Sequence, residues 1–160
     1  QVGELLPQGL SASAAAFAKL RHFSEELFDG FAGASVQRFA SFVPEDFAMM
    51  SSALGVTHRV LESSAWHGEP LWLLGRYAAE SLEAGRSGWS PRQVAEVLQP
   101  FAVLHVHCKP LLLAAEAHFR GSVGAYAPRD LVRVLHGFRD TGHLNVPQVA
   151  CAWDVTRERL

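Results

Sequence analysis

The stretch APRDLVRVLHGF, residues 127–138, matches a second stretch, SPRQVAEVLQPF, residues 90–101, in length and pattern. Each has a proline at its second position, and Pro91 and Pro128 lie 37 residues apart. Proline is tolerated in the first turn of a helix, because the N–H that it lacks would be unpaired there anyway. A serine such as Ser90 also suits a helix start. The two stretches therefore predict two equivalent helices, each beginning at its proline.

The same spacing extends over the rest of the chain. Pro7 lies 37 residues before Pro44, and Pro44 lies 47 residues before Pro91, which is ten more than the period. Apolar residues recur three and ten residues after each proline: Leu10, Phe47, Val94 and Leu131, then Phe17, Leu54, Phe101 and Phe138. Together with apolar residues at the sixth and seventh positions of the last two segments, they form one face of a helix with period 3.6. The four prolines thus mark the starts of four helices, which we call the A helices.

A second helix, which we call the B helix, follows each A helix. Pro110 and Pro147 each lie 19 residues after the proline of their segment, whereas Pro70 lies 26 residues after Pro44. Seven inserted residues are therefore expected in the loop around 63–69, and three more after the second B helix, near 83–88. In the first segment, Ser24 is predicted to cap the B helix.

This arrangement predicts an all-α fold. Neither helix of a pair can bury its apolar face alone, and stacking of neighbouring pairs would bury a continuous core. We expect an α-solenoid of about four helix-turn-helix repeats with a 37-residue period. A single array would cover residues 1–160, with units at about 7–43, 44–90, 91–127 and 128–160. A simple four-helix bundle is disfavoured, because eight helices share one frame.

Pro100 conflicts with this pattern, because it falls nine residues into the third A helix. An interior proline costs about 3 kcal/mol. Small residues stand at the matching positions of the other units: Ala16, Ala53 and Gly137. We therefore expect the A helices to approach closely at this position, and Pro100 to kink its helix or end it early.

Composition restricts the environment and the partners. Charged residues make up 19% of the chain, below the roughly 25% that is usual for soluble domains, which is typical of a surface that partners cover. Two cysteines argue against a disulfide scaffold. No apolar run approaches the roughly 18 residues of a membrane span. The first residue is Gln1 rather than Met, which fits a mature or trimmed form.

Charge is unevenly distributed, although the chain's net charge is only −2. Residues 1–80 carry five Lys or Arg against nine Asp or Glu, a net charge of −4, and residues 81–160 carry nine against seven, a net charge of +2. Twelve of the fourteen basic residues are arginine, whose planar guanidinium suits phosphate and stacked bases. The composition of a GC-rich genome would also favour arginine.

The 37-residue helix pair with the pattern PRDLVRVLHGF resembles the heptatricopeptide repeats of organellar RAP-domain proteins. That group also contains octotricopeptide and FAST-kinase-like proteins. The resemblance extends from Pro7 to Leu160 and implies a protein of the mitochondrial matrix that handles RNA; some such proteins are components of mitochondrial ribosomes. A RAP domain is not recognisable among these residues. The sequence leaves open whether the array continues or packs against another chain.

The candidate RNA contacts lie in the last two units. Exposed positions of their A helices are expected to hold Arg92, Gln93, Gln99, Arg129, Arg133 and His136. Arg129 and Arg133 are four residues apart on one helix face, and Arg92 matches Arg129 in the frame, so together they could meet phosphates. The corresponding residues Gln8, Glu45 and Asp46 are not basic, so RNA is expected at the C-terminal half. A solvated face partly neutralised by Glu96 and Asp130 is the alternative.

The stretch HVHCKP, residues 105–110, does not satisfy the requirements of a metal site. Zinc needs about four ligands with recognisable spacing, and no second Cys/His pair follows His105, His107 and Cys108. We interpret the stretch as the turn between the A and B helices of the third unit. From that turn, His107 and Lys109 could touch RNA phosphate.

Four tryptophans complete the list of candidate contacts. Trp66 and Trp89 could stack on bases, but tryptophan at such positions more commonly packs or anchors a partner. Trp72 and Trp153 fall in B helices and are expected in the core.

The sequence predicts no enzyme. It lacks a phosphate-binding G-x-x-x-x-G-K-[ST], a G-x-S-x-G elbow and an H-E-x-x-H motif, so we expect no catalytic residues, cofactor, metal or small-molecule substrate. The expected function is structural RNA binding in a mitochondrial ribonucleoprotein, namely contact with rRNA in the mitochondrial ribosome beside neighbouring protein chains. The alternative is a helical scaffold that binds only protein within another large mitochondrial complex.

Overall fold

The four prolines of the repeated frame begin four of the eight α-helices in a computed structural model, which describes residues 2–61, 68–85 and 88–158. The A helices are α1 (Pro7–Lys19), α3 (Pro44–Leu61), α5 (Pro91–Val103) and α7 (Pro128–Asp140). The B helices are α2 (Glu25–Val36), α4 (Gly68–Glu83), α6 (Lys109–Ser122) and α8 (Val146–Glu158). Throughout the described part of the chain there are helices and no strand, so the all-α prediction is confirmed.

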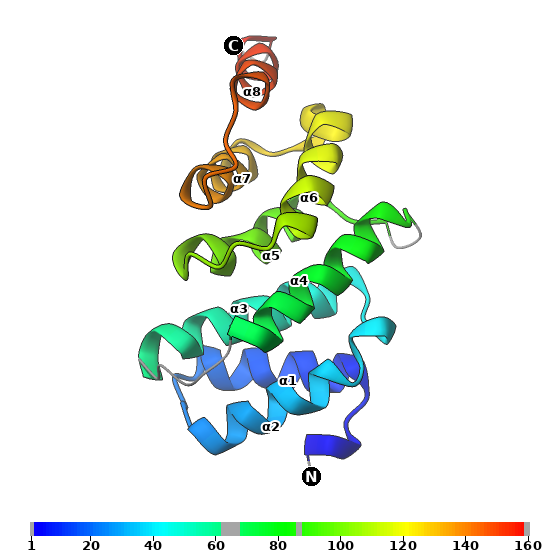
Figure 1. The fold of residues 1–160 in the computed structure, drawn as a ribbon, viewed down its shortest axis with the longest axis vertical. Helices are drawn as coiled ribbons and strands as arrows, with labels where there is room; N and C mark the ends of the chain where they lie inside the picture. The colour runs from blue at the N-terminus through cyan, green and yellow to red at the C-terminus, as the bar shows by residue number, and fades with distance from the viewer. Residues whose placement is uncertain (1, 62–67, 86–87, 159–160) are drawn as a thin grey trace.

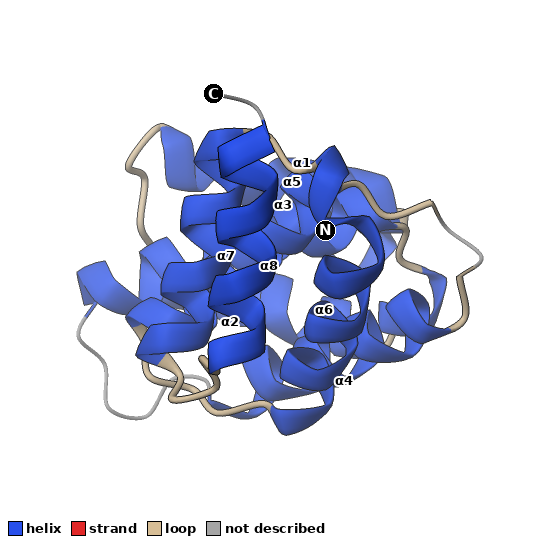
Figure 2. Cartoon of the chain, turned by 90° about the horizontal axis from the view of Figure 1, so that it is seen from above, coloured by secondary structure: helices blue, strands red, loops and turns tan. Residues whose placement is uncertain are grey.

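The A helices lie side by side in chain order, and the main contacts of each are with the A helices before and after it (Figure 1). Among the B helices, α4 packs closely on α6, whereas α8 makes fewer contacts with the rest of the chain. The two ends of the chain lie at opposite ends of the molecule in Figure 1. In the view along its length in Figure 2, the A helices α1, α3 and α5 lie one behind another.

The apolar positions of the frame form the core. The residues three positions after each proline are all buried: Leu10, Phe47, Val94 and Leu131. The residues ten positions after are buried in the last three units, whereas Phe17 is only half-buried. Burial of such a side chain stabilises the fold by about 1.5–3 kcal/mol. The repeated pattern therefore identifies the central core correctly.

Consecutive A helices approach closely at the positions that hold small residues. A Cβ atom on Gly55 of α3 would lie 2.5 Å from Cβ of Pro100 in α5, and one on Gly137 of α7 would lie 3.3 Å from Cβ of Leu98. The predicted close approach is confirmed. The expectation that Pro100 ends its helix early is wrong, because α5 continues to Val103 and is 13 residues long, like α1 and α7. The buried Pro100 ring fills the space above Gly55, which offsets the hydrogen bond that proline cannot donate.

Three A helices end in the same way. Arg21, His105 and Gly142 each lie 14 residues after the proline of their unit, and each has a positive φ of 55°, 52° and 71° respectively. In each unit the next residue donates its backbone N–H to the carbonyl ten positions after the proline, over 2.7–3.0 Å. These bonds form a Schellman motif, which normally has glycine at the left-handed position. Two of the three units therefore carry a strained residue there.

Replacing Arg21 with glycine should stabilise the protein. The left-handed conformation costs an L-residue about 1–2 kcal/mol, and the greater freedom of glycine in the unfolded chain removes about half of that gain. We expect Arg21→Gly to raise the free energy of unfolding by about 0.5–1 kcal/mol and Gly142→Ala to lower it by about 1 kcal/mol. Urea denaturation measures both. A loss of stability in Arg21→Gly would contradict the assignment of this cap.

The approach to each A helix also recurs. Short 3-10 helices occupy the same place before Pro7, Pro44 and Pro128: η1 (Val2–Glu4), η2 (Phe39–Ser41) and η3 (Val123–Ala125). A large apolar residue then stands two positions before each proline: Leu5, Phe42, Trp89 and Tyr126. The three aromatic members of this set are buried. This anchor is part of the repeated pattern and was not among the predicted features.

Two expectations about the B helices and the insertion need correction. Trp72 and Trp153 were expected in the core, but they are 37% and 67% exposed, because each lies on a face of its B helix that no described helix covers. The inserted residues do not all lie in a loop, since α3 has 18 residues whereas the other A helices have 13. Part of the insertion therefore extends α3.

Candidate nucleic-acid interface

A groove of about 480 Å³ crosses the exposed side of the A helices. Its lining comes from α1, α3 and α5, with Arg133 contributed by α7. Four basic residues line it: Lys19, Arg59, Arg92 and Arg133. Two acidic residues, Glu45 and Glu96, also line it. The groove therefore joins basic residues from both halves of the chain and has a net positive lining.

Arg92, Gln99 and Arg133 are the predicted contacts that the structure brings to this groove. The Arg92 Nε donates to Glu96 Oε1 over 2.8 Å, and this hydrogen bond, together with the charge of Glu96, raises the pKa of Arg92. The Arg133 Nη1 lies 3.9 Å from Asp130 Oδ1. The Arg92 pair is at the surface, where such pairs contribute little stability, so Arg92 could exchange its carboxylate for a phosphate at small cost. The Arg133 pair is partly buried, because the side chains of Arg133 and Asp130 are 27% and 13% exposed.

The other four predicted contacts lie outside the groove lining. Arg129 and His136 are exposed on α7, the helix that also carries Arg133. Lys109 begins α6, and His107 precedes it in the turn, with its Nδ1 3.3 Å from the Thr141 carbonyl oxygen. All four side chains are exposed. The structure thus places three predicted residues in the groove, two more on α7, and two at the turn.

Lys19 and Arg59 were not selected from the sequence. Each lies in the last turn of its A helix, where a cation also stabilises the helix dipole. They lie 12 and 15 residues after their prolines, so they share no frame position, and they meet only because α1 and α3 pack side by side. The expectation of contacts confined to the C-terminal half overlooked this packing.

Two predicted surface residues serve as helix caps instead. Gln93 was expected to be exposed, but its Oε1 accepts the Ser90 N–H over 3.0 Å, and its Nε2 donates to Glu45 Oε2 over 3.0 Å. Asp46 was also expected at the surface, yet it is 2% exposed. Its carboxylate accepts hydrogen bonds from the Ser11 hydroxyl at 2.6 Å and the Val43 N–H at 3.1 Å. These side chains fix helix starts and the contact between α1 and α3.

Trp66 and Trp89 were the two tryptophans considered for base stacking or for packing. Trp89 is 8% exposed, stacks on Phe47 with 5.8 Å between ring centroids, and donates its indole N–H to Ser81 Oγ over 3.1 Å. Its predicted packing role is confirmed, which excludes base stacking at this position. Trp66 lies outside the described residues.

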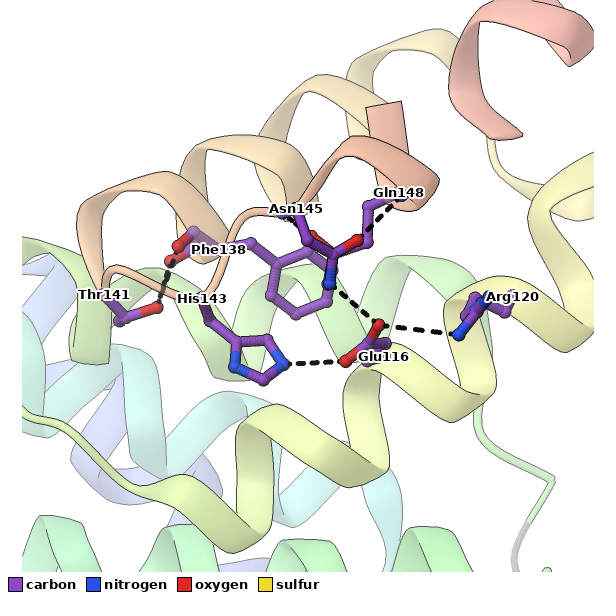
Figure 3. Close-up of polar contacts among 8 residues, drawn as sticks. Glu116, Arg120, Phe138, Thr141, His143, Asn145 and Gln148 are labelled. Carbon is purple, nitrogen blue, oxygen red and sulfur yellow. Dashed lines mark hydrogen bonds and ion pairs between the residues drawn. The ribbon is translucent and has the colours of Figure 1, made fainter. Parts of the chain in front are cut away.

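A second polar cluster joins α6 to the turn between α7 and α8 (Figure 3). Glu116 Oε2 lies 2.9 Å from His143 Nε2, and Glu116 Oε1 accepts from Asn145 Nδ2 over 3.1 Å. Asn145 and Gln148 cap α8 reciprocally, each accepting the backbone N–H of the other over 2.9–3.0 Å. Burial alone would raise the pKa of Glu116, but the hydrogen bonds from Asn145 and His143 outweigh it and lower the pKa. This cluster holds the start of α8 in place.

The turn that contains His105 and His107 places Cys108 inward, where burial raises the pKa of its thiol. Among the residues that the structure describes, no three His, Cys, Asp or Glu side chains are grouped so that they could hold a metal ion. Within the same residues, no helix is both long enough and apolar enough to span a membrane.

Comparison of the chain with protein-family models, curated proteins and solved structures finds no match. Evidence for its function therefore comes from its own residues and their arrangement.

Proposed function

We propose that the chain is an α-solenoid of helix-turn-helix repeats that binds RNA as a structural component of a mitochondrial ribonucleoprotein. The groove over the A helices would hold the RNA backbone. Our further proposal, which depends on the family resemblance, is that the particle is the mitochondrial ribosome in the matrix and the ligand is rRNA.

The observation that carries this proposal is the set of four basic side chains in one groove. Lys19, Arg59, Arg92 and Arg133 come from four successive A helices. An extended phosphate chain needs cations spaced along a path, which a row of parallel helices provides. Arg129 and His136 would extend this path along α7.

The second candidate is a helical scaffold that binds only protein. The acidic residues Glu45 and Glu96 in the groove favour it, as does the exposed apolar side of α8, where Val149 is 47% exposed. RNA would be repelled by the first feature and would gain nothing from the second.

Fluorescence anisotropy with mixed single-stranded RNA fragments at increasing salt separates the two candidates. Contacts with several phosphates predict a steep loss of affinity as salt rises, with a slope of log K against log salt of about −0.7 per phosphate for a single strand. A scaffold that binds only protein predicts no binding even at low salt.

The double variant Arg129→Glu/Arg133→Glu tests the site. We expect its RNA affinity to fall at least tenfold and its salt dependence to become shallower, because phosphate contacts are lost. The matched control is Arg76→Glu/Arg157→Glu, which makes the same change in net charge on the B helices α4 and α8. Equal losses of affinity in both variants would show that net charge alone causes the loss, and that Arg129 and Arg133 do not contact the RNA.

A further inference from the structure

The contacts between consecutive A helices use two recurring sets of positions. Residues four, seven and eleven positions after one proline face residues two, six and nine positions after the next. The contacts that establish this are Ser11 with Asp46, Ser51 with Val97, Gly55 with Pro100, and Leu98 with Gly137. Each A helix therefore has a forward side and a backward side, and the internal interfaces join one to the other.

The forward side of α7 has no described partner. Val132, four positions after Pro128, is 53% exposed, whereas the matching Ser11, Ala48 and Ala95 are at most 3% exposed. On α8, Val149 and Trp153 match Leu112 and Glu116 in the frame, and Leu112 is 1% exposed. We call these residues the C-terminal end face: Val132, Leu135, Arg139, Val149 and Trp153.

The backward side of α1 is open as well. Ala16 is exposed, and Leu20 is 77% exposed. The matching residues of α3, Ala53 and Thr57, are at most 1% exposed. We call these residues the N-terminal end face: Gly9, Ser13, Ala16 and Leu20.

The two end faces complement each other as the internal interfaces do. Inside the molecule, the Leu98 side chain fits against Gly137, and the Pro100 ring fits against Gly55. At the ends, Val132 and Leu135 are the large residues, and Gly9, Ser13 and Ala16 are the small ones. The net charges of the two halves, −4 for residues 1–80 and +2 for residues 81–160, favour the approach of opposite halves over long range, and Arg139 is the one charged residue of the end faces themselves.

We propose that the C-terminal end face of one molecule binds the N-terminal end face of a second copy, head to tail. The partner is a second copy because each molecule carries both halves of the interface, built on the contacts that join its own helices. A heterologous contact gives linear chains unless the rotation between neighbours closes a ring, and the opposite positions of the two end faces favour linear chains of molecules. This assembly does not depend on RNA binding.

Sedimentation equilibrium over a range of concentrations tests the proposal. The wild-type mass should rise from that of the 17.5 kDa monomer and pass beyond two copies as concentration increases. Val132→Glu blocks one end and Ala16→Glu the other, and both positions are exposed, so neither change disturbs the core. We expect each variant alone to remain monomeric. The control Leu113→Glu changes a residue that is 48% exposed in the middle of the array, and it should associate like the wild type.

A mixture of the two blocked variants gives the decisive result. Ala16→Glu keeps its C-terminal end face and Val132→Glu keeps its N-terminal end face, so the mixture should form a complex of two chains and no larger species. Circular dichroism of each variant confirms that it is folded. A wild type that stays monomeric at every concentration would overturn the proposal, as would self-association of either blocked variant or failure of the folded pair to combine.

Discussion

Gly55→Ala is expected to lower the free energy of unfolding by about 1 kcal/mol, although alanine favours helices. The new methyl group would lie 2.5 Å from Cβ and 2.9 Å from Cγ of Pro100, distances that no real contact adopts. The rigid pyrrolidine ring cannot rotate away, so α3 and α5 must move apart. Overpacking of this kind costs about 1–3 kcal/mol, which exceeds the propensity gain of about 0.5–1 kcal/mol.

Urea denaturation of a double-mutant cycle isolates the cause. In a Pro100→Gly background the same Gly55→Ala change should cost less than about 0.5 kcal/mol, because Cβ and Cγ of the ring are gone and the Cα that remains at position 100 is 3.3 Å from the new methyl group. Gly33→Ala in α2 is the matched control, since its new Cβ would have no atom within 4 Å. It should stabilise the protein by about 0.5–1 kcal/mol. Equal effects at Gly33 and Gly55 would show that the close contact is absent in solution.

Glu116→Ala is the second large effect that we expect, and it should act on α8. Without the carboxylate, Asn145 and His143 lose the acceptor that joins their turn to α6, and unpaired polar groups at a partly buried site cost about 1–3 kcal/mol. Because α8 buries only Gln148 and Ala152, this loss is large compared with its other contacts. Hydrogen exchange should accelerate about tenfold or more in α8 and hardly change in α5.

The stabilisation that Glu116 provides should be lost at low pH. The pKa of Glu116 is lowered in the folded protein, so its contribution to stability is complete above the ordinary carboxyl pKa of about 4.3 and is lost as pH falls through the lower folded value. The difference between wild type and Glu116→Ala should therefore shrink below about pH 4. Glu80→Ala removes a carboxylate that is 58% exposed and 3.5 Å from Arg76, and should cost at most about 0.5 kcal/mol at any pH. An equal effect in both variants would contradict the role of the cluster.

The starts of the A helices and the central core could be predicted from the sequence because each depends on local chemistry. A proline is well tolerated in a first helical turn, and the apolar positions three and ten residues later follow from the period of the helix. Ser24 and Ser90 cap their helices as expected, with hydroxyl oxygens 3.3–3.4 Å from the N–H groups that they accept.

The remaining features depend on contacts between units, which no single helix pattern contains. Trp72 and Trp153 lie in amphipathic helices, but their exposure depends on whether another helix covers them. Asp46 resembles a surface acid until α1 brings the Ser11 hydroxyl to it. Lys19 and Arg59 join the groove only because α1 and α3 pack beside α5. Pro100 could be predicted to lie at a close contact, whereas the continuation of α5 beyond it depends on the space above Gly55.

The neighbour-to-neighbour packing of the A helices has a mechanical consequence. Each A helix is supported mainly by the ones before and after it. A small tilt at one interface therefore rotates all the helices on one side of it relative to those on the other side. The joint between α3 and α5, where Pro100 rests on Gly55, connects the acidic half of the chain to the basic half. The curvature of the groove, and with it the distance between Lys19 and Arg133, is therefore set at a glycine and a proline that themselves line it.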